Sequence, residues 1–99
     1  PWPGPAQVLR FGYNTGEAIA DTDVIVRGPD GSVRQRGRTD TEGRHAFVAD
    51  APGTWSVQID DGLGHVVDAR VTVAADGAAR VDAAAEPAAV SVQLVLLLL

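Results

Sequence analysis

The sequence predicts an all-β protein, an antiparallel β-sandwich of about six or seven strands. Two observations predict this fold class. Short segments in which apolar and polar residues alternate recur along the chain, and turn sequences rich in Gly, Pro, Asp and Asn separate them roughly every 8–12 residues. No apolar spacing of helical period is found before residue 83. A chain of 99 residues is the size of one such domain.

Four strands are expected in the first half of the chain, at residues 6–13, 22–27, 32–38 and 44–49. They end at turn sequences such as Asn-Thr-Gly and Pro-Asp-Gly, whose residues favour turn conformations. The third segment carries three arginines and suits a sheet edge, where charge opposes pairing with another chain. Residues 1–5, PWPGP, are predicted to be a disordered lead-in because Pro and Gly interrupt regular structure.

Residues 54–73 predict a long hairpin that organises the second half of the chain. Apolar residues occupy every second position of both strands, and a slip by one residue would turn one apolar row toward water, so the two rows fix the register. The expected pairs are Trp55 with Val71, Val57 with Ala69 and Ile59 with Val67. The predicted core combines bulky members of these rows with an aromatic residue of the preceding strand: Trp55, Val57, Ile59, Phe47 and Val71. A last short strand is expected at residues 78–82.

The tip of this hairpin is expected to bring two ionisable side chains together. The register places Asp61 opposite His65 across the loop Gly62-Leu63-Gly64. Hairpin loops of this length usually need a residue at positive φ, which glycine adopts readily. We therefore expect a carboxylate and an imidazole side by side where the core-facing row ends.

Composition argues against several classes of function. The net charge is −5 and the basic residues, all arginine, form no stripe, so no nucleic-acid partner is expected. Without cysteine the chain has neither a disulfide framework nor a thiol nucleophile. The serines lie in no nucleophile-elbow pattern, and the sequence contains no His-Glu-x-x-His and no phosphate-binding glycine loop. We expect the protein not to be an enzyme.

The C-terminal part of the sequence is predicted to leave the sandwich, which spans residues 6–82. Residues 83–89, AAAEPAA, read as a tether because Pro87 prevents a helix from running through them. Residues 90–99 are uncharged and end in a run of leucines. They are about half as long as a membrane-spanning helix, so we interpret them as the start of a truncated transmembrane segment. A buried terminal strand is the alternative.

Several short motifs resemble a known domain family. The run Gly-Glu-Ala-Ile-Ala-Asp-Thr-Asp-Val-Ile-Val from residue 16 is followed by Pro-Asp-Gly, Thr-Asp-x-x-Gly-Arg and Pro-Gly-x-Trp. This order is similar to that of the carboxypeptidase-regulatory-like (transthyretin-like) β-sandwich. Trp55 and the later Asp-Asp-Gly-Leu-Gly-His, residues 60–65, resemble the accessory extracytoplasmic subunit of nickel/cobalt uptake transporters of the energy-coupling-factor type. Such a subunit is a β-sandwich with one C-terminal membrane span.

The hairpin tip is the best candidate site in the sequence. An imidazole nitrogen and carboxylate oxygens suit Ni²⁺ or Co²⁺, so His65, Asp61 and Asp60 are candidate metal ligands. They would form an open site that water or a partner chain completes. His45 is a further candidate ligand if folding brings it near His65, and is otherwise a histidine of the core or sheet edge. The alternatives for the tip are an ion pair that stabilises the hairpin and a docking contact with a membrane partner.

Together, the residues and the resemblance predict a non-enzymatic accessory component of a nickel or cobalt importer. Its expected partner is the membrane subunit of the transporter, which it would stabilise or supply with metal. The resemblance implies an extracytoplasmic location with attachment to the cytoplasmic membrane. A structural or adhesion-type cell-surface module with no metal role is the alternative.

Overall fold

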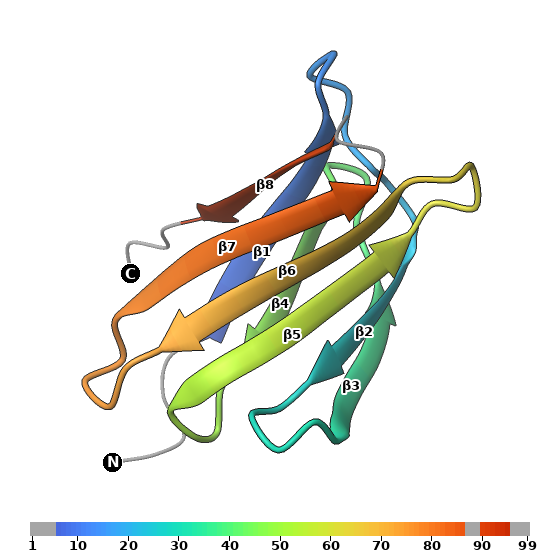
Figure 1. The fold of residues 1–99 in the computed structure, drawn as a ribbon. Coiled ribbons are helices and arrows are strands. Elements are labelled where there is room, and N and C mark those ends of the chain that lie inside the picture. The colour runs from blue at the N-terminus through green and yellow to red at the C-terminus, as the bar shows by residue number, and fades with distance from the viewer. Residues whose placement is uncertain (1–5, 87–89, 96–99) are drawn as a thin grey trace.

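Eight β-strands and no helix make up the part of the chain that the computed structural model describes, residues 6–86 and 90–95 (Figure 1). All strand pairs in this part are antiparallel. The all-β class predicted from the alternating pattern is therefore confirmed, with one strand more than the larger number expected. In chain order the strands are β1 (Ala6–Tyr13), β2 (Asp23–Arg27), β3 (Val33–Arg38), β4 (Arg44–Val48), β5 (Gly53–Asp60), β6 (Val66–Val73), β7 (Ala79–Glu86) and β8 (Val90–Val95).

The strands form two sheets that pack face to face as a β-sandwich. The larger sheet has the order β3-β2-β5-β6-β7, and the smaller has the order β4-β1-β8. Figure 1 shows the larger sheet in front of the smaller one, with β7 and β8 near each other along one side. Each sheet has one apolar face, and packing these faces against each other removes both from water.

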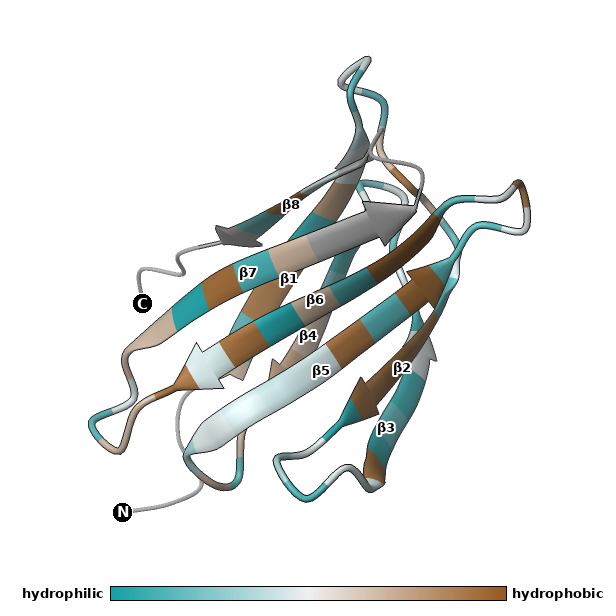
Figure 2. Ribbon diagram, in the orientation of Figure 1, coloured by the Kyte–Doolittle hydropathy of each residue, from teal (hydrophilic) through white to brown (hydrophobic). Residues whose placement is uncertain are grey.

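The core between the sheets is built from the apolar rows that alternate along the strands. All five residues predicted as core are at most 3% exposed: Trp55, Val57, Ile59, Phe47 and Val71. Figure 2 shows the alternation of hydrophobic and hydrophilic residues along β5 and β6. The ring of Trp55 lies 5.5 Å from that of Phe47, and its Nε1 donates a 3.0 Å hydrogen bond to the backbone oxygen of Ala51. The one polar atom of this buried ring is thus satisfied.

The β5–β6 hairpin has the register that its alternation predicts. The three expected pairs are observed: Trp55 with Val71, Val57 with Ala69 and Ile59 with Val67. Beyond these pairs, the backbone N–H of Asp61 donates a 3.1 Å hydrogen bond to the backbone oxygen of His65. Gly62 and Gly64 have φ angles of 76° and 94°, so both loop glycines adopt the backbone conformation that side chains disfavour.

The C-terminal part of the described chain joins the sandwich as strands. β7 continues to Glu86, so residues 83–86, which the sequence assigned to a tether, pair with β6 instead. This pairing satisfies backbone groups of β6 that would otherwise form a free sheet edge. Residues 87–89 lie outside the described residues.

Residues 90–95 form β8, an edge strand beside β1, and not the beginning of a helix. The segment reads VSVQLV, and its first four residues alternate apolar with polar side chains. An alternating segment next to the open edge of β1 completes backbone hydrogen bonds there, which favours a strand over a helix. None of the described residues forms a helix long and apolar enough to cross a membrane. Residues 96–99 of the expected membrane segment lie outside the described part.

We predict that β8 contributes to stability through Val92, which lies opposite Phe11 and packs against the core. Val92→Asp places a charge against apolar neighbours and should lower the free energy of unfolding by about 1–3 kcal/mol. Gln93→Asp adds the same charge at the next, exposed position and should change this free energy by less than about 0.5 kcal/mol. Urea unfolding followed by tryptophan fluorescence measures both. Equal effects of the two substitutions would contradict the packing of β8.

Candidate functional site

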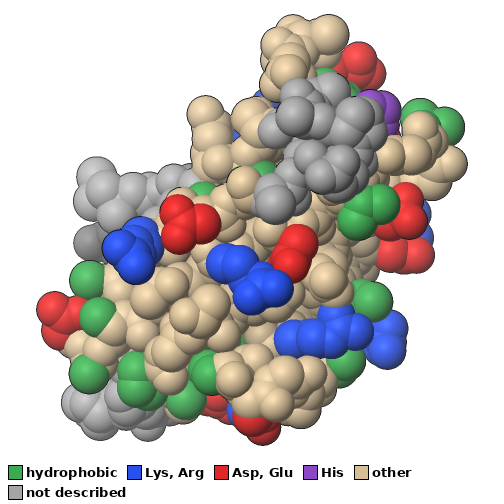
Figure 3. All heavy atoms as spheres, viewed as in Figure 1, with side chains coloured by type: hydrophobic (Ala, Val, Ile, Leu, Met, Phe, Trp, Pro, Cys, Tyr) green, Lys and Arg blue, Asp and Glu red, His purple; other side chains and the backbone are tan. Residues whose placement is uncertain are grey.

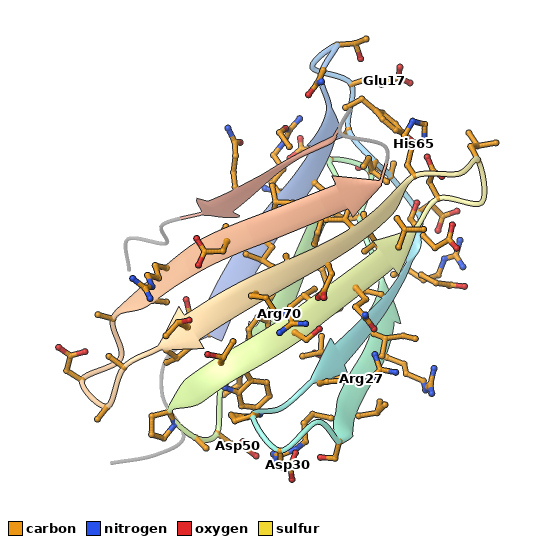
Figure 4. All side chains as sticks on the ribbon, in the orientation of Figure 1. Glu17, Arg27, Asp30, Asp50, His65 and Arg70 are labelled. Atoms are coloured by element: carbon orange, nitrogen blue, oxygen red, sulfur yellow. The ribbon has the colours of Figure 1, made fainter. Side chains whose placement is uncertain are left out.

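Three side chains meet at one end of the sandwich, where the two sheets approach each other. Asp61 follows β5, His65 precedes β6, and Tyr13 is the last residue of β1 in the opposite sheet. The Tyr13 hydroxyl donates a 2.7 Å hydrogen bond to Asp61 Oδ2, and His65 Nδ1 lies 2.6 Å from the same oxygen. Figure 4 shows His65 beside the hairpin tip, close to the end of β1. We call these three residues the Tyr-Asp-His network.

Asp61 is the buried centre of this network. Its side chain is 3% exposed and accepts four hydrogen bonds, two at each oxygen. At Oδ1 the donors are the backbone N–H groups of Leu63, at 2.7 Å, and His65, at 3.1 Å. Burial by itself raises the pKa of Asp61, but the hydrogen bonds from Tyr13, the two backbone amides and His65 outweigh it and lower the pKa to about 2. Asp61 is therefore an ionised carboxylate at neutral pH, with its acceptor positions occupied.

Tyr13 links the hairpin tip to the smaller sheet. Its ring meets the His65 ring edge to face, with centroids 5.2 Å apart and planes at 69°. The hydrogen bond to Asp61 raises the pKa of Tyr13 to about 12, with burial and the negative charges of Asp61 and Glu17 acting in the same direction. Tyr13 is a neutral donor at neutral pH, and ionisation would place two negative charges together.

The network fixes the orientation and the tautomer of His65. Asp61 is ionised and accepts hydrogen bonds only, so the proton of a neutral His65 ring resides on Nδ1. Nε2 then carries a lone pair, and no hydrogen bond to it is made by the described residues. The His65 side chain is 25% exposed, so this nitrogen belongs to a partly accessible ring. A neutral imidazole held in this way by a carboxylate is the arrangement found around metal-binding histidines.

The other proposed donors do not complete a metal centre with His65. Asp60 is exposed, and its Oδ1 accepts a 2.8 Å hydrogen bond from the backbone N–H of Gly62, which stabilises the loop. The four acceptor positions of Asp61 are occupied, so a bond to a metal would displace an existing donor. Within residues 6–86 and 90–95, no group of three or more His, Asp and Glu side chains is placed to hold a metal ion. This part of the chain offers a single free imidazole nitrogen at the tip.

His45 lies elsewhere and fits a packing role. It is on β4 opposite Leu9, and its ring covers Gly37 of β3, so it fills the side of the sandwich where the two sheet edges meet. A Cβ atom at Gly37 would lie 2.6 Å from Cε1 of His45, which shows how closely the ring approaches the backbone there. His45 Nε2 is buried and has no hydrogen-bond partner among the described residues. The glycine in β3 and the histidine in β4 are therefore complementary in shape.

Sequence reasoning placed Asp61 and His65 together and missed Tyr13. The available signal was the row Leu9, Phe11 and Tyr13, which alternates along one face of β1 and ends in a side chain with a polar tip. Leu9 and Phe11 are fully buried, so Tyr13 continues a core-facing row to its end. Which residue of the opposite sheet it meets depends on how the two sheets pack, which the alternation does not specify.

The fold and the site define a class of protein: an antiparallel β-sandwich that presents an oriented histidine at one end. Comparison with protein-family models finds no match, and comparisons with curated proteins and with solved structures find none either. The functional inference therefore depends on the residues themselves.

We predict that ionised Asp61 makes the free energy of unfolding decrease as the pH falls into the acidic range. The folded pKa of about 2 lies below the ordinary value of 3.8, so ionised Asp61 stabilises the fold above about pH 4 and this contribution is lost as pH falls through about 2. The difference corresponds to roughly 2 kcal/mol. Asp61→Asn should lower the free energy of unfolding at pH 6 by about this amount, with a smaller effect near pH 2.

Urea unfolding at a series of pH values from 2 to 6 or so measures this dependence. Asp60→Asn is the matched control, because it removes the neighbouring charge outside the Tyr-Asp-His network, and it should keep the wild-type dependence. If the free energy of unfolding of Asp61→Asn depends on pH in the same way as that of the wild type, the ionised carboxylate does not have this stabilising role.

We also predict coupling between Gly37 and His45. Gly37→Val should lower the free energy of unfolding by about 1–3 kcal/mol, because the new side chain collides with the His45 ring. The same substitution in a His45→Ala background should cost at least about 0.5 kcal/mol less, because the ring is gone. Thermal or urea unfolding of the four proteins gives the interaction energy. If the two costs are equal, the ring of His45 does not occupy the space over Gly37.

Proposed function

We propose that the protein is a non-enzymatic, extracytoplasmic accessory component of a nickel or cobalt importer, which offers its cargo metal one ligand, His65. The observation that carries this proposal is the 2.6 Å contact between His65 Nδ1 and the ionised Asp61, because it leaves Nε2 as a lone-pair donor. Imidazole nitrogen is a favoured ligand of Ni²⁺ and suits Co²⁺ as well. The resemblance of residues 60–65 to such subunits supports the same assignment.

In this proposal Asp61 positions the ligand His65, whereas the sequence alone suggested that Asp61 is itself a metal ligand. With its acceptor positions taken by Tyr13, His65 and two backbone amides, Asp61 orients the ligand and does not bind the metal. A carboxylate in this position holds the imidazole ring at one angle and fixes its tautomer. Asp60 and His45 have no part in this version of the site.

One imidazole from this chain makes a weak metal contact, and in a transporter such weakness is useful. A cargo ion has to be released to the next component, so the remaining ligands are assigned to water and to the membrane subunit. Leu63, at the apex of the same loop, is 78% exposed between two glycines and supplies an apolar contact for that partner. In this proposal the tip docks on the membrane subunit and brings His65 with it.

Membrane attachment belongs to the same proposal. Because residues 90–95 form β8 beside β1, an anchoring helix in this scheme begins after Val95. Val95 pairs with Val8, whereas the hairpin tip lies at the Tyr13 end of β1, so the anchor and the tip are at opposite ends of the sandwich. In this scheme the sandwich therefore lies on its side against the membrane, which lets the tip reach the membrane subunit. We also propose that the domain is related to carboxypeptidase-regulatory-like sandwiches. The two antiparallel sheets are consistent with this relationship.

A structural or adhesion-type cell-surface module is the second candidate function. One observation favours it: the Tyr-Asp-His network satisfies Asp61 completely within the described chain and joins the two sheets. A network of this kind stabilises the end of a sandwich whether or not a metal approaches His65. In this alternative, His65 is a structural residue and the exposed tip contacts another surface protein.

Titration with Ni²⁺, followed by nuclear magnetic resonance of backbone amides, distinguishes the two functions. We predict that Ni²⁺ selectively broadens signals from residues 62–66 in the wild-type chain, because a paramagnetic ion bound at Nε2 lies next to them. His65→Gln should abolish the selective broadening. His45→Gln is the matched control, because it removes the other histidine, and should leave the broadening intact.

Uniform weak broadening, or identical responses of wild type and His65→Gln, would refute metal binding by His65. In that case, the surface-module function becomes the better assignment. A response that depends on His45 in place of His65 would refute the site as well, because it would locate the metal at the side of the sandwich.

A further inference from the structure

A row of three polar residues crosses the outer face of the larger sheet. Arg27 of β2 lies opposite Ser56 of β5, and Ser56 lies opposite Arg70 of β6. Neighbouring strands are about 4.8 Å apart, so the backbones of the two arginines are separated by about 10 Å, with a small side chain between them. Figure 4 shows Arg27 and Arg70 on the side of this sheet that faces away from the core. Two long cationic side chains thus flank a serine.

An open hollow of about 460 Å³ lies along this row. Its lining combines side chains of the sheet with the β2–β3 turn: Arg27, Gly28, Pro29, Gly31, Thr54, Ser56, Gln58 and Arg70. Of these described residues, two are charged and both are arginines. Figure 3 looks onto this face, where arginine and acidic side chains are spread among uncharged groups. The charged side chains that line the hollow are therefore both cationic, with the carboxylate of Asp68 paired to one of them, in a chain whose net charge is −5.

The acceptors next to the hollow are already used. Gln58 Oε1 accepts a hydrogen bond from Nη1 of Arg27. Asp68 lies beside the hollow, where its Oδ2 accepts from Nε and Nη2 of Arg70, at 3.1 and 3.0 Å, and its Oδ1 accepts from the Ser56 hydroxyl at 2.9 Å. These bonds hold the side chains in place and leave the acceptors with existing partners.

The donors are not exhausted. Within the described residues, Nε and Nη2 of Arg27, Nη1 of Arg70 and the amide nitrogen of Gln58 have no hydrogen-bond acceptor. Asp82 follows Arg70 in the same row on β7, but the two form no ion pair there. The polar groups that remain without a partner at the hollow are thus mainly hydrogen-bond donors. They belong to Arg27, Arg70 and Gln58, and the two arginines are cationic. Such a surface selects an anion with several acceptor oxygens.

We propose that this hollow is a binding site for a phosphate group, clamped between Arg27 and Arg70 over Ser56. Phosphate presents more acceptor oxygens and more negative charge than a carboxylate, which suits donors that approach from two sides. A guanidinium group is a planar fork that can bind phosphate through paired hydrogen bonds. Arg27 has its Nε–Nη2 edge free for such a pair, and Arg70 adds a donor at Nη1. A phosphorylated small molecule and a phospholipid headgroup share this chemistry. The site contains no residue of the Tyr-Asp-His network, so it stands or falls independently of the proposed function.

Titration of the 99-residue chain with inorganic phosphate at low ionic strength tests the proposal. We expect saturable shifts of the backbone amide signals of Gly28, Thr54 and Ser56 in nuclear magnetic resonance spectra. Arg27→Gln and Arg70→Gln should each weaken binding about tenfold or more, because each removes charge-assisted hydrogen bonds. Arg36→Gln is the matched control: it removes an equal charge from exposed strand β3 and should leave binding unchanged.

Vesicles separate the two sources of the phosphate group. A lipid headgroup is the ligand if the protein sediments with phosphatidylglycerol vesicles but not with phosphatidylcholine vesicles. Arg27→Gln and Arg70→Gln should then each abolish this sedimentation. Saturable binding of phosphate without vesicle binding would identify a soluble phosphorylated ligand. Phosphate shifts that do not saturate, or an equal loss of binding in all three arginine variants, would overturn the proposal, because the effect would then reflect charge alone.

Discussion

The interaction on which the site depends is the acceptance of four hydrogen bonds by one buried carboxylate, Asp61. Burial of a charge is costly unless polar partners replace water, and here they come from three places in the chain. The loop supplies two backbone amides, His65 supplies its ring, and Tyr13 reaches across from the opposite sheet, 48 residues away in sequence. A single group therefore closes the hairpin tip, joins the two sheets and fixes the His65 ring.

The sequence predicts this site to the extent that it is local. Strict alternation on β5 and β6 determines their register, and the register carries Asp61 to His65 without knowledge of any other strand. Tyr13 is beyond the reach of that reasoning, because its partner depends on the packing of one sheet on another. The same holds for His45 and Gly37, whose close fit arises where the edges of two different sheets meet. Periodicity determines pairs within a hairpin, and packing determines the rest.

The C-terminal strands illustrate a second limit. An apolar segment as short as residues 90–95 is compatible with a strand or with part of a helix, and its composition does not distinguish them. What decides is whether a sheet edge is available nearby. β1 has such an edge, and so has β6, where alanine-rich residues 83–86 pair although alanine has little preference for strands. The predictions of a tether at residues 83–89 and of a membrane segment at residues 90–99 each considered only the sequence of the segment. The structure that such a segment adopts depends also on the strands beside it.

The alternation that builds the core also divides the chemistry of β5 and β6 into two sets. The inward row ends at the tip, where the contact of Nδ1 with Asp61 places the lone pair of a neutral His65 ring on Nε2, an electron donor suited to a cation. The outward row carries Ser56 and Arg70, and with Arg27 it leaves hydrogen-bond donors suited to an anion. Because apolar residues occupy the inward row between them, the two surfaces share no polar contact in the described chain. If both proposals hold, a change in one row should alter one type of binding without affecting the other.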